Sequence, residues 1–352
     1  MKLSELGFTE QLENYRVAQK LTDFEVGRVI TEHRERYIVK TAEHELEAEV
    51  SGNLRFSASS REDFPAVGDW VCLTTYDGDF SIIHHLLPRS SVLARQAVGR
   101  HGEAQLIATN IDFAFLVQAV DRDFNINRLE RYLSICNSSK VSPIIVLTKT
   151  DLITSQQKTE YIDSILHRIK NIPVVALSNL TSEGIETLSA FLQAGKTYCL
   201  LGSSGVGKSS LINTLCGKSL MRTDAISANT NKGRHITTHR ELILLEGGAL
   251  LIDNPGMREV GIADTTNGVE TTFNSIISLA QNCKFADCSH TNEVGCRVLE
   301  ALQNGDIDQE SFSNYQKMER EKAFFESSQA ELRKKDKDFG KMLKNYKKSL
   351  GR

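Results

Sequence analysis

The sequence has no long hydrophobic run. Its longest apolar stretches, such as FAFLV at 113–117, are far too short to cross a bilayer. The N-terminal residues MKLSELGFTEQLENY are polar and lack the basic segment followed by an apolar segment that marks a secretory signal. These absences exclude a membrane-spanning helix and predict a cytoplasmic protein that has no membrane partner.

Cysteine is also scarce, with seven in 352 residues. Four of them lie singly on or near apolar segments, where we expect buried thiols in a reducing compartment rather than disulfides. These four are Cys72, Cys136, Cys199 and Cys216. The other three lie close together near the C-terminus and need a separate explanation.

The formal net charge is only −3, but it hides an asymmetry. Residues 333–352 carry nine basic and two acidic side chains, a net of +7, so the rest of the chain carries −10. Such a segment fits a polyanionic partner, and it also fits a solvated, frayed tail. Apolar residues recur there at helical spacing, which predicts a helix with its lysines mainly elsewhere on its surface. They are Phe339, Met342, Leu343, Tyr346 and Leu350.

The length of the chain predicts two or three domains, and the first of them reads as β structure over residues 24–87. Five short segments rich in Val, Ile and aromatic residues are separated by turn residues, with no helical pattern between them. They are FEVGRVI, RYIVKTA, ELEAEVSG, GDWVCLTTY and SIIHHLLP. Five such strands predict a small β-barrel, with an OB-type fold as the leading candidate.

From about residue 105 the pattern changes to alternating strands and helices. The strands are NIDFAFLVQAV, SPIIVLT, IPVVALS and KTYCLLG, and two more, joined at Glu246-Gly247-Gly248, follow in RELILLEGGALLIDNPG. This alternation predicts a mostly parallel, doubly wound α/β sheet. Nucleotides bind such sheets at the carboxyl ends of the strands.

The stretch GSSGVGKS at 202–209 fits the phosphate-loop pattern G-x-x-x-x-G-K-[ST] and lies between a predicted strand and a predicted helix. Its glycines let backbone N–H groups turn toward phosphates, while Lys208 reaches the β- and γ-phosphates and Ser209 ligates Mg²⁺. A chance glycine-rich turn is the alternative, and the flanking elements argue against it. The predicted nucleotide-binding residues here are Gly202, Ser203, Ser204, Gly205, Val206, Gly207, Lys208, Ser209 and Ser210.

The stretch DNPG at 253–256 follows an apolar strand. We predict that Asp253 holds the Mg²⁺ through its hydration water and that Gly256 offers its N–H to the γ-phosphate. Alone, D-x-x-G is usually a turn. Its position at a strand end downstream of a phosphate loop makes it a strong signal.

Two polar loops predict base recognition. TKTD, comprising Thr148, Lys149, Thr150 and Asp151, follows one apolar strand, and ALSNLTSEG at 176–184, with Ser178 and Asn179, follows the next. The Asp151 carboxylate only accepts hydrogen bonds, so it matches the N1–H and N2 amine of guanine and not adenine. The Lys149 stem is expected to lie along the base plane.

Close to the C-terminus, CKFADCSHTNEVGC provides a dense cluster of possible metal ligands. Cys283, Cys288, His290 and Cys296 have the spacing C-x4-C-x-H-x5-C, which suits tetrahedral Zn²⁺ with no open position for catalysis. The sequence therefore predicts one structural zinc ion. Four incidental residues are the alternative.

The base-recognition loops precede the phosphate loop, GRHITT at 233–238 and DNPG, which is the order of the circularly permuted GTPases. With a barrel before and the cysteines behind, the chain resembles the ribosome small-subunit-dependent GTPase A (RsgA/YjeQ) family. The resemblance implies a monomeric GTPase that binds the small ribosomal subunit and its rRNA late in maturation, and it implies the same four zinc ligands. It also favours an RNA-binding role for the basic tail. Departures from the family pattern are Thr148, Asn179, Ile236 and Asn254.

For catalysis, Met257 stands where many GTPases have a water-orienting Gln. A thioether orients water poorly, so we expect slow unaided hydrolysis. His235 is a candidate replacement, although a loop histidine is more often simply solvated. Thr237 or Thr238 is the candidate Mg²⁺ ligand that closes over the γ-phosphate.

These observations predict a multidomain protein: an N-terminal extension (1–23), a five-stranded OB-type barrel (24–90), a circularly permuted α/β P-loop GTPase domain (91–262) and a helical zinc-binding domain (263–352). The predicted function is hydrolysis of GTP to GDP and phosphate, stimulated by the subunit. The alternative is an RNA-binding assembly protein that uses GTP mainly as a sensor. An ATP-using P-loop enzyme is disfavoured by Asp151.

Overall fold

The computed structural model describes residues 2–33, 36–76, 80–96, 104–121, 124–217, 241–253, 266–323, 334 and 337. The chain divides into two compact units. One comprises Met1–Leu93 and Leu106–Glu259, and the other comprises Ala94–Gln105 and Val260–Arg352. In the described part of the chain, no helix has both the length and the hydropathy needed to cross a membrane.

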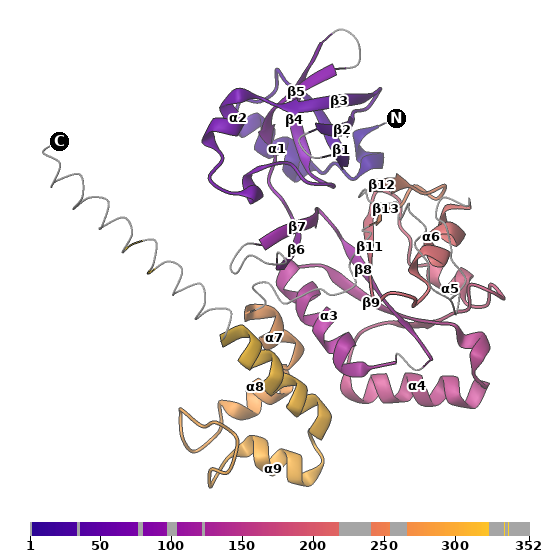
Figure 1. The fold of residues 1–352 in the computed structure, drawn as a ribbon, viewed down its shortest axis with the longest axis vertical. Coiled ribbons are helices and arrows are strands. Elements are labelled where there is room, and N and C mark those ends of the chain that lie inside the picture. The colour runs from indigo at the N-terminus through magenta and orange to yellow at the C-terminus, as the bar shows by residue number, and fades with distance from the viewer. Residues whose placement is uncertain are drawn as a thin grey trace, which may run out of the picture. The chain divides into compact units, whose positions relative to one another are not determined.

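The first unit begins with a closed barrel (Figure 1). Its strands are β1 (Glu25–His33), β2 (Arg36–Lys40), β3 (Glu45–Val50), β4 (Trp70–Tyr76) and β5 (Phe80–Leu86). They pair in the order β1-β2-β3-β5-β4, and β4 closes the barrel on β1. Only β3 and β5 run parallel, and α2 (Gly52–Ser57) lies between β3 and β4 in the chain. The predicted OB-type barrel is confirmed.

The barrel forms because its strands alternate between inward apolar and outward polar side chains. In β3, Leu46, Ala48 and Val50 are buried, while the glutamates between them are more exposed. Facing residues of the other strands complete one core.

A second set of strands in the same unit builds the α/β sheet. They are β8 (Phe113–Ala119), β9 (Ser142–Thr148), β10 (Val174–Ala176), β11 (Thr197–Leu201), β12 (Glu241–Leu244) and β13 (Leu250–Asp253). Their order is β10-β9-β8-β11-β13-β12, parallel throughout except for β12. The sheet continues into the barrel where β12 meets β1 at Thr31 and Glu241.

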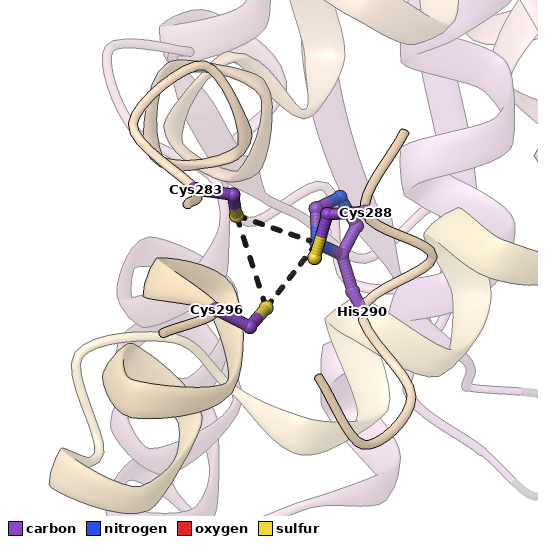
Figure 2. A group of neighbouring side chains, drawn as sticks. All are labelled: Cys283, Cys288, His290 and Cys296. Carbon is purple, nitrogen blue, oxygen red and sulfur yellow. Dashed lines mark hydrogen bonds between the residues drawn. The ribbon is translucent and has the colours of Figure 1, made fainter. Parts of the chain in front are cut away.

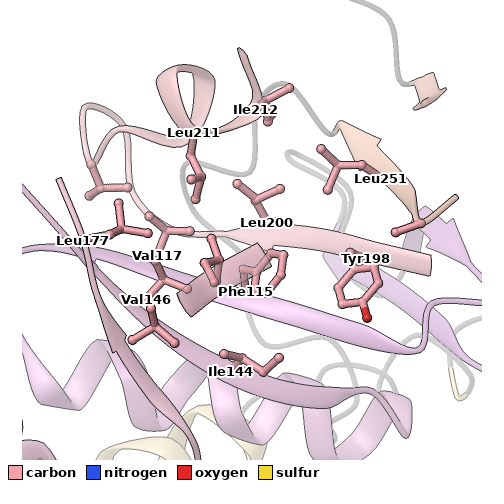
Figure 3. Packing of buried hydrophobic residues seen from close by; sticks show 14 of the residues in the cluster. Phe115, Val117, Ile144, Val146, Leu177, Tyr198, Leu200, Leu211, Ile212 and Leu251 are labelled. Atoms are coloured by element: carbon pink, nitrogen blue, oxygen red, sulfur yellow. The ribbon is translucent and has the colours of Figure 1, made fainter. Parts of the chain in front are cut away.

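The helices of this α/β region lie on both sides of the sheet, as Figure 1 shows. They are α3 (Ile126–Ser139), α4 (Ser155–Arg168), α5 (Ile185–Ser189) and α6 (Lys208–Cys216). Leu188 of α5 and Leu211 of α6 pack on Phe115, Val146 and other strand residues in one apolar core (Figure 3). Parallel strands covered on both faces read as continuous apolar runs, and every residue of β11 is buried.

The N-terminal extension, which the sequence left without structure, forms η1 (Leu3–Leu6) and α1 (Glu10–Ala18). It is held by Arg28 of β1, which is 1% exposed. The Arg28 guanidinium donates to the carbonyl oxygens of Leu6 (2.5 Å), Gly68 (3.2 Å) and Asn110 (3.1 Å). Burial lowers the pKa of Arg28 to about 10, although Asp112 and Asp69 act to raise it. One side chain thus joins the extension, the barrel and the α/β region.

We expect Arg28→Met to lower the free energy of unfolding of this unit by about 3 kcal/mol or more, because buried carbonyl groups lose their donor. The fluorescence of the single tryptophan, Trp70, would report it during urea unfolding, since Trp70 is buried beside the guanidinium. Arg36→Met is the matched control, because Arg36 is exposed and makes only a 3.5 Å ion pair with Glu49. Equal losses in the two variants would contradict the role of Arg28.

Two strands were not predicted. β6 (Val92–Gln96) and β7 (Ala104–Thr109) form a separate two-stranded sheet between the barrel and the α/β region in the chain. Their sequences, VLARQ and AQLIAT, are short and carry no clear alternation, so only their pairing identifies them.

The second unit is mainly helical over residues 266–323. It contains α7 (Thr266–Thr272), α8 (Asn274–Ala280), α9 (Arg297–Asn304) and a further helix over 309–323. Phe273, Ile276, Val298, Phe312 and Met318 are among the residues of its core. Of the basic segment 333–352, only Lys334 and Lys337 are described, both helical, so the predicted apolar stripe at 339–350 lies outside the described residues.

The four scattered cysteines are buried and form no disulfide in the described part of the chain, as predicted. Burial raises the pKa of Cys72 to about 11 and that of Cys199 to about 12. Such thiols are poor nucleophiles near neutral pH, which fits a packing role.

Candidate functional site

The phosphate loop lies between β11 and α6, as its motif requires. Gly205 and Gly207 have φ angles of +80° and +92°, a region that favours glycine. A Cβ atom on Gly202 would stand 2.4 Å from the carbonyl oxygen of Val117, so this position also needs glycine. The Lys208 amine donates to the carbonyl oxygens of Gly202 (2.6 Å) and Ser203 (2.5 Å), which places it inside the curl of the loop.

The serines of the motif are more open to solvent. Ser204 and Ser209 are exposed, whereas Ser203 and Ser210 are half-buried and Val206 is buried. Ser209 and Ser210 belong to the first turn of α6, where backbone N–H groups are free to face an anion.

The first base loop leaves β9 at Thr148, which is fully buried. The Thr148 hydroxyl donates to the carbonyl oxygen of Val206 at 2.6 Å, which ties this loop to the phosphate loop. Lys149 has a left-handed φ of +61°, and its amine forms a 2.7 Å ion pair with Asp121 at the end of β8. Thr150 and Asp151 then form a short 3₁₀ turn (Thr150–Leu152).

The second base loop contacts both of the other segments. Ser178 donates its hydroxyl hydrogen to the Asp151 carboxylate at 2.5 Å. Asn179 donates its amide hydrogen to the carbonyl oxygen of Gly207 at 3.2 Å. The structure therefore brings together three segments that the sequence separates, and Ser178 and Asn179 connect Asp151 to Gly207, the residue before Lys208.

Asp253 ends β13, which pairs with β11 beside the phosphate loop. Its side chain is 8% exposed. The pKa of Asp253 is raised to about 6, mainly by burial and also by Glu241, while Lys208 acts to lower it. A buried carboxylate close to the amine of Lys208 fits a divalent cation, which would stabilise its ionised form.

Several predicted residues lie outside the described part of the chain. These are His235, Thr237, Thr238, Gly256 and Met257. Their proposed roles therefore rest on the sequence pattern.

Sequence reasoning missed two residues that support the site. Asp121 fixes Lys149, and Tyr132 of α3, 4% exposed, hydrogen-bonds Ser203 of the phosphate loop. Asp121 had a usable signal, because it follows an apolar strand whose carboxyl end faces the same edge of the sheet. Tyr132 had none, because on a helix it resembles an ordinary core residue.

The four predicted metal ligands lie together in the second unit, with all ligand atoms within 4.8 Å of one another (Figure 2). The Cys283 sulfur is 3.8 Å from that of Cys296 and 3.7 Å from His290 Nδ1, which is 3.3 Å from the Cys296 sulfur. Four-coordinate zinc with Zn–S bonds of about 2.3 Å requires sulfurs about 3.8 Å apart. The spacing therefore fits tetrahedral zinc.

The surroundings of Cys283 and Cys296 favour thiolates, whereas burial raises the pKa of Cys288 to about 11. Cys296 is the N-cap of α9 and accepts a hydrogen bond from the backbone N–H of Leu299. Burial acts to raise the pKa of Cys283, but hydrogen bonds from the backbone of Arg297 and Val298 outweigh it and lower that pKa. Because thiolates are the zinc-binding form of cysteine, this electrostatic environment suits a metal centre.

Comparisons with known families agree with this geometry. A family model described as RsgA GTPase matches residues 86–263. A second model, described as 50S ribosome-binding GTPase, matches residues 197–346, a stretch that starts at β11 and leaves both base loops upstream. That placement is expected when the GTPase motifs occur in circularly permuted order.

Curated relatives match the chain over nearly its whole length. "Small ribosomal subunit biogenesis GTPase RsgA 1" of Bacteroides thetaiotaomicron is 38% identical over 98% of this chain and 97% of its own. "Small ribosomal subunit biogenesis GTPase RsgA 2" of Lactiplantibacillus plantarum is 43% identical, with 90% and 89% covered.

Two solved structures share the fold. YjeQ from Thermotoga maritima has a TM-score of 0.64 and 26% identity, covering 84% of this chain and 96% of its own. YloQ, described as a circularly permuted GTPase, has a TM-score of 0.60 and 24% identity, covering 88% of this chain and 96% of its own. YloQ supports the fold alone.

Proposed function

The chain belongs to the RsgA GTPase family, and from that premise we propose that it is a GTP hydrolase acting in maturation of the small ribosomal subunit. The curated relatives are named for biogenesis of that subunit, and their matches span almost the entire chain. The observation that carries the proposal is the convergence of both base loops on the phosphate loop, through the bonds of Thr148 and Asn179.

We propose that Asp151 selects guanine. Its carboxylate offers only acceptors, which match the N1–H and N2 amine of guanine. Ser178 donates to Asp151 Oδ1 and so fixes the plane of the carboxylate. Lys149, held by Asp121, is placed to lay its stem along the base.

The phosphates are proposed to bind the N–H groups of residues 202–210 and the amine of Lys208. Bound Mg²⁺ would neutralise charge on the β- and γ-phosphates, and Ser209 and Asp253 are the described residues that fit it. When phosphate oxygens arrive, the Lys208 amine exchanges its two carbonyl partners for them.

Hydrolysis is proposed to depend on the subunit. Met257 orients water poorly, and His235 or a ribosomal group would take over that role, with Thr237 or Thr238 closing over the γ-phosphate and Gly256 donating its N–H to it. The permuted order places the segment after Asp253 directly before the zinc-binding unit. We propose that this connection passes the state of the γ-phosphate to the C-terminal region.

We further propose that the protein is a cytoplasmic monomer and that its basic segment, 333–352, contacts rRNA phosphates.

Steady-state GTP turnover with and without purified small subunits tests the function. We expect the subunits to raise turnover by about 10³-fold, which lowers the barrier by about 4 kcal/mol. Lys208→Ala is expected to abolish the stimulated rate. Negligible turnover with subunits present, together with subunit binding that Lys208→Ala leaves intact, would instead support the sensor alternative.

A further inference from the structure

Two side chains from different base loops donate to consecutive carbonyl groups of the phosphate loop. Thr148 bonds the oxygen of Val206 at 2.6 Å, and Asn179 bonds the oxygen of Gly207 at 3.2 Å. A loop held at two adjacent peptide groups has little freedom to rotate. Thr148 ends a strand and is fixed by the sheet, whereas Asn179 lies in a loop whose position depends on its own contacts.

Those contacts lead back to the base-selecting carboxylate. The Ser178 hydroxyl donates to Asp151 at 2.5 Å and accepts from the backbone N–H groups of Leu180 (3.1 Å) and Thr181 (3.2 Å). The residues before and after Asn179 are therefore joined through the Ser178 hydroxyl. Ser178 is fully buried, and its hydroxyl joins Asp151 to the loop that carries Asn179.

The other end of the network sets the start of α6. Gly207 is the N-cap of this helix, and its carbonyl oxygen also accepts the helical bond from Leu211 at 2.9 Å. The contact is close, because a Cβ atom on Gly207 would stand 3.1 Å from Asn179 Nδ2. Asn179 Oδ1 is buried and has no hydrogen-bond partner among the described residues. Among the described residues, the Asn179 carboxamide is therefore held through its nitrogen.

We propose that Asn179 is a positioning residue that couples recognition of the base at Asp151 to the geometry of the phosphate loop. The inference rests on the proposed GTP site and deepens it. Bound guanine fixes Asp151 and Ser178, Ser178 fixes the loop, and Asn179 then holds Gly207 and the helix N-terminus in their phosphate-binding orientation.

A mutant cycle between Asn179→Ala and Asp151→Asn tests this coupling, with the dissociation constant of GDP and Mg²⁺ measured by calorimetry on the full chain. In the wild-type background, Asn179→Ala should weaken GDP binding about 3- to 10-fold, the worth of one net hydrogen bond. In the Asp151→Asn background, where guanine no longer fixes the network, the same change should cost less than about 2-fold. With xanthosine diphosphate, which the second background should accept, the loss should return.

Two further variants exclude a general packing effect. Asn179→Asp keeps the shape but turns an oxygen toward the Gly207 carbonyl, so it should weaken GDP binding more than Asn179→Ala does. Gln156→Ala removes an exposed carboxamide on α4 that bonds only Glu160 in the structure, and it should leave GDP affinity unchanged.

The outcomes separate this inference from the function on which it rests. Additive losses in the cycle, or equal losses for the Ala and Asp variants, would overturn the coupling role of Asn179. If Asp151→Asn itself left GDP affinity unchanged, the base assignment would fail instead.

Discussion

Asp151→Asn is expected to weaken GTP binding about 100-fold or more and to create affinity for xanthosine triphosphate. The variant presents an amide N–H group to the N1–H and N2 amine of guanine, so donors would face donors. Xanthine carries an oxygen in place of that amine and accepts the new hydrogen bond. Competition binding with the two nucleotides measures the exchange.

The structure fixes which way the new amide points. Ser178 already donates to Asp151 Oδ1 and receives two backbone N–H groups, so it retains only that hydrogen to donate. The amide oxygen of the variant therefore faces Ser178, and its nitrogen faces the base. Asp163→Asn, an exposed change on α4, is the matched control and should leave both affinities unchanged. Unchanged GTP affinity in Asp151→Asn would refute guanine selection by this residue.

Loss of zinc is expected to have the largest effect on the C-terminal unit. Cys296→Ser removes a ligand that also caps α9, and structural zinc in small domains contributes roughly 10 kcal/mol of folding free energy. The residues that surround the cluster belong to the core of this unit, including Cys296, Val298 and Phe312. We therefore expect zinc-free protein to lose helical circular dichroism and to be cleaved by protease after residue 266.

Zinc content and proteolysis together decide this prediction. Cys216→Ala, which changes a cysteine outside the cluster, should retain one zinc ion per chain. A Cys296→Ser protein that held one zinc ion and kept its helical signal would rule out the proposed Cys₃His site.

The sequence predicted those parts of the site whose residues are close neighbours in the chain. GSSGVGKS and the four candidate metal ligands were identified by spacing, because local spacing alone can place glycines at a tight turn or thiols around one ion. The barrel and the α/β sheet were predictable for a related reason, since alternating and continuous apolar patterns follow from how many faces of a strand are buried.

Two departures from the family pattern, Thr148 and Asn179, make contacts that the sequence did not predict. The sequence identified Thr148 only as a departure from the family pattern. In the structure its hydroxyl reaches the carbonyl of Val206, and Asn179 supplies an amide to the next carbonyl. Neither contact has a signature in the sequence, because each depends on where two separate strands end in the sheet.

By itself the sequence determined the ingredients of this protein: a phosphate-loop motif, two candidate base loops in permuted order, a barrel pattern and a set of candidate metal ligands. Only the tertiary structure decided how they are joined. Thr148 meets a residue 58 positions away, Ser178 one 27 positions away, and Arg28 one 82 positions away. Such contacts arise when packing of the sheet brings strand ends together, so residues far apart in the chain can meet.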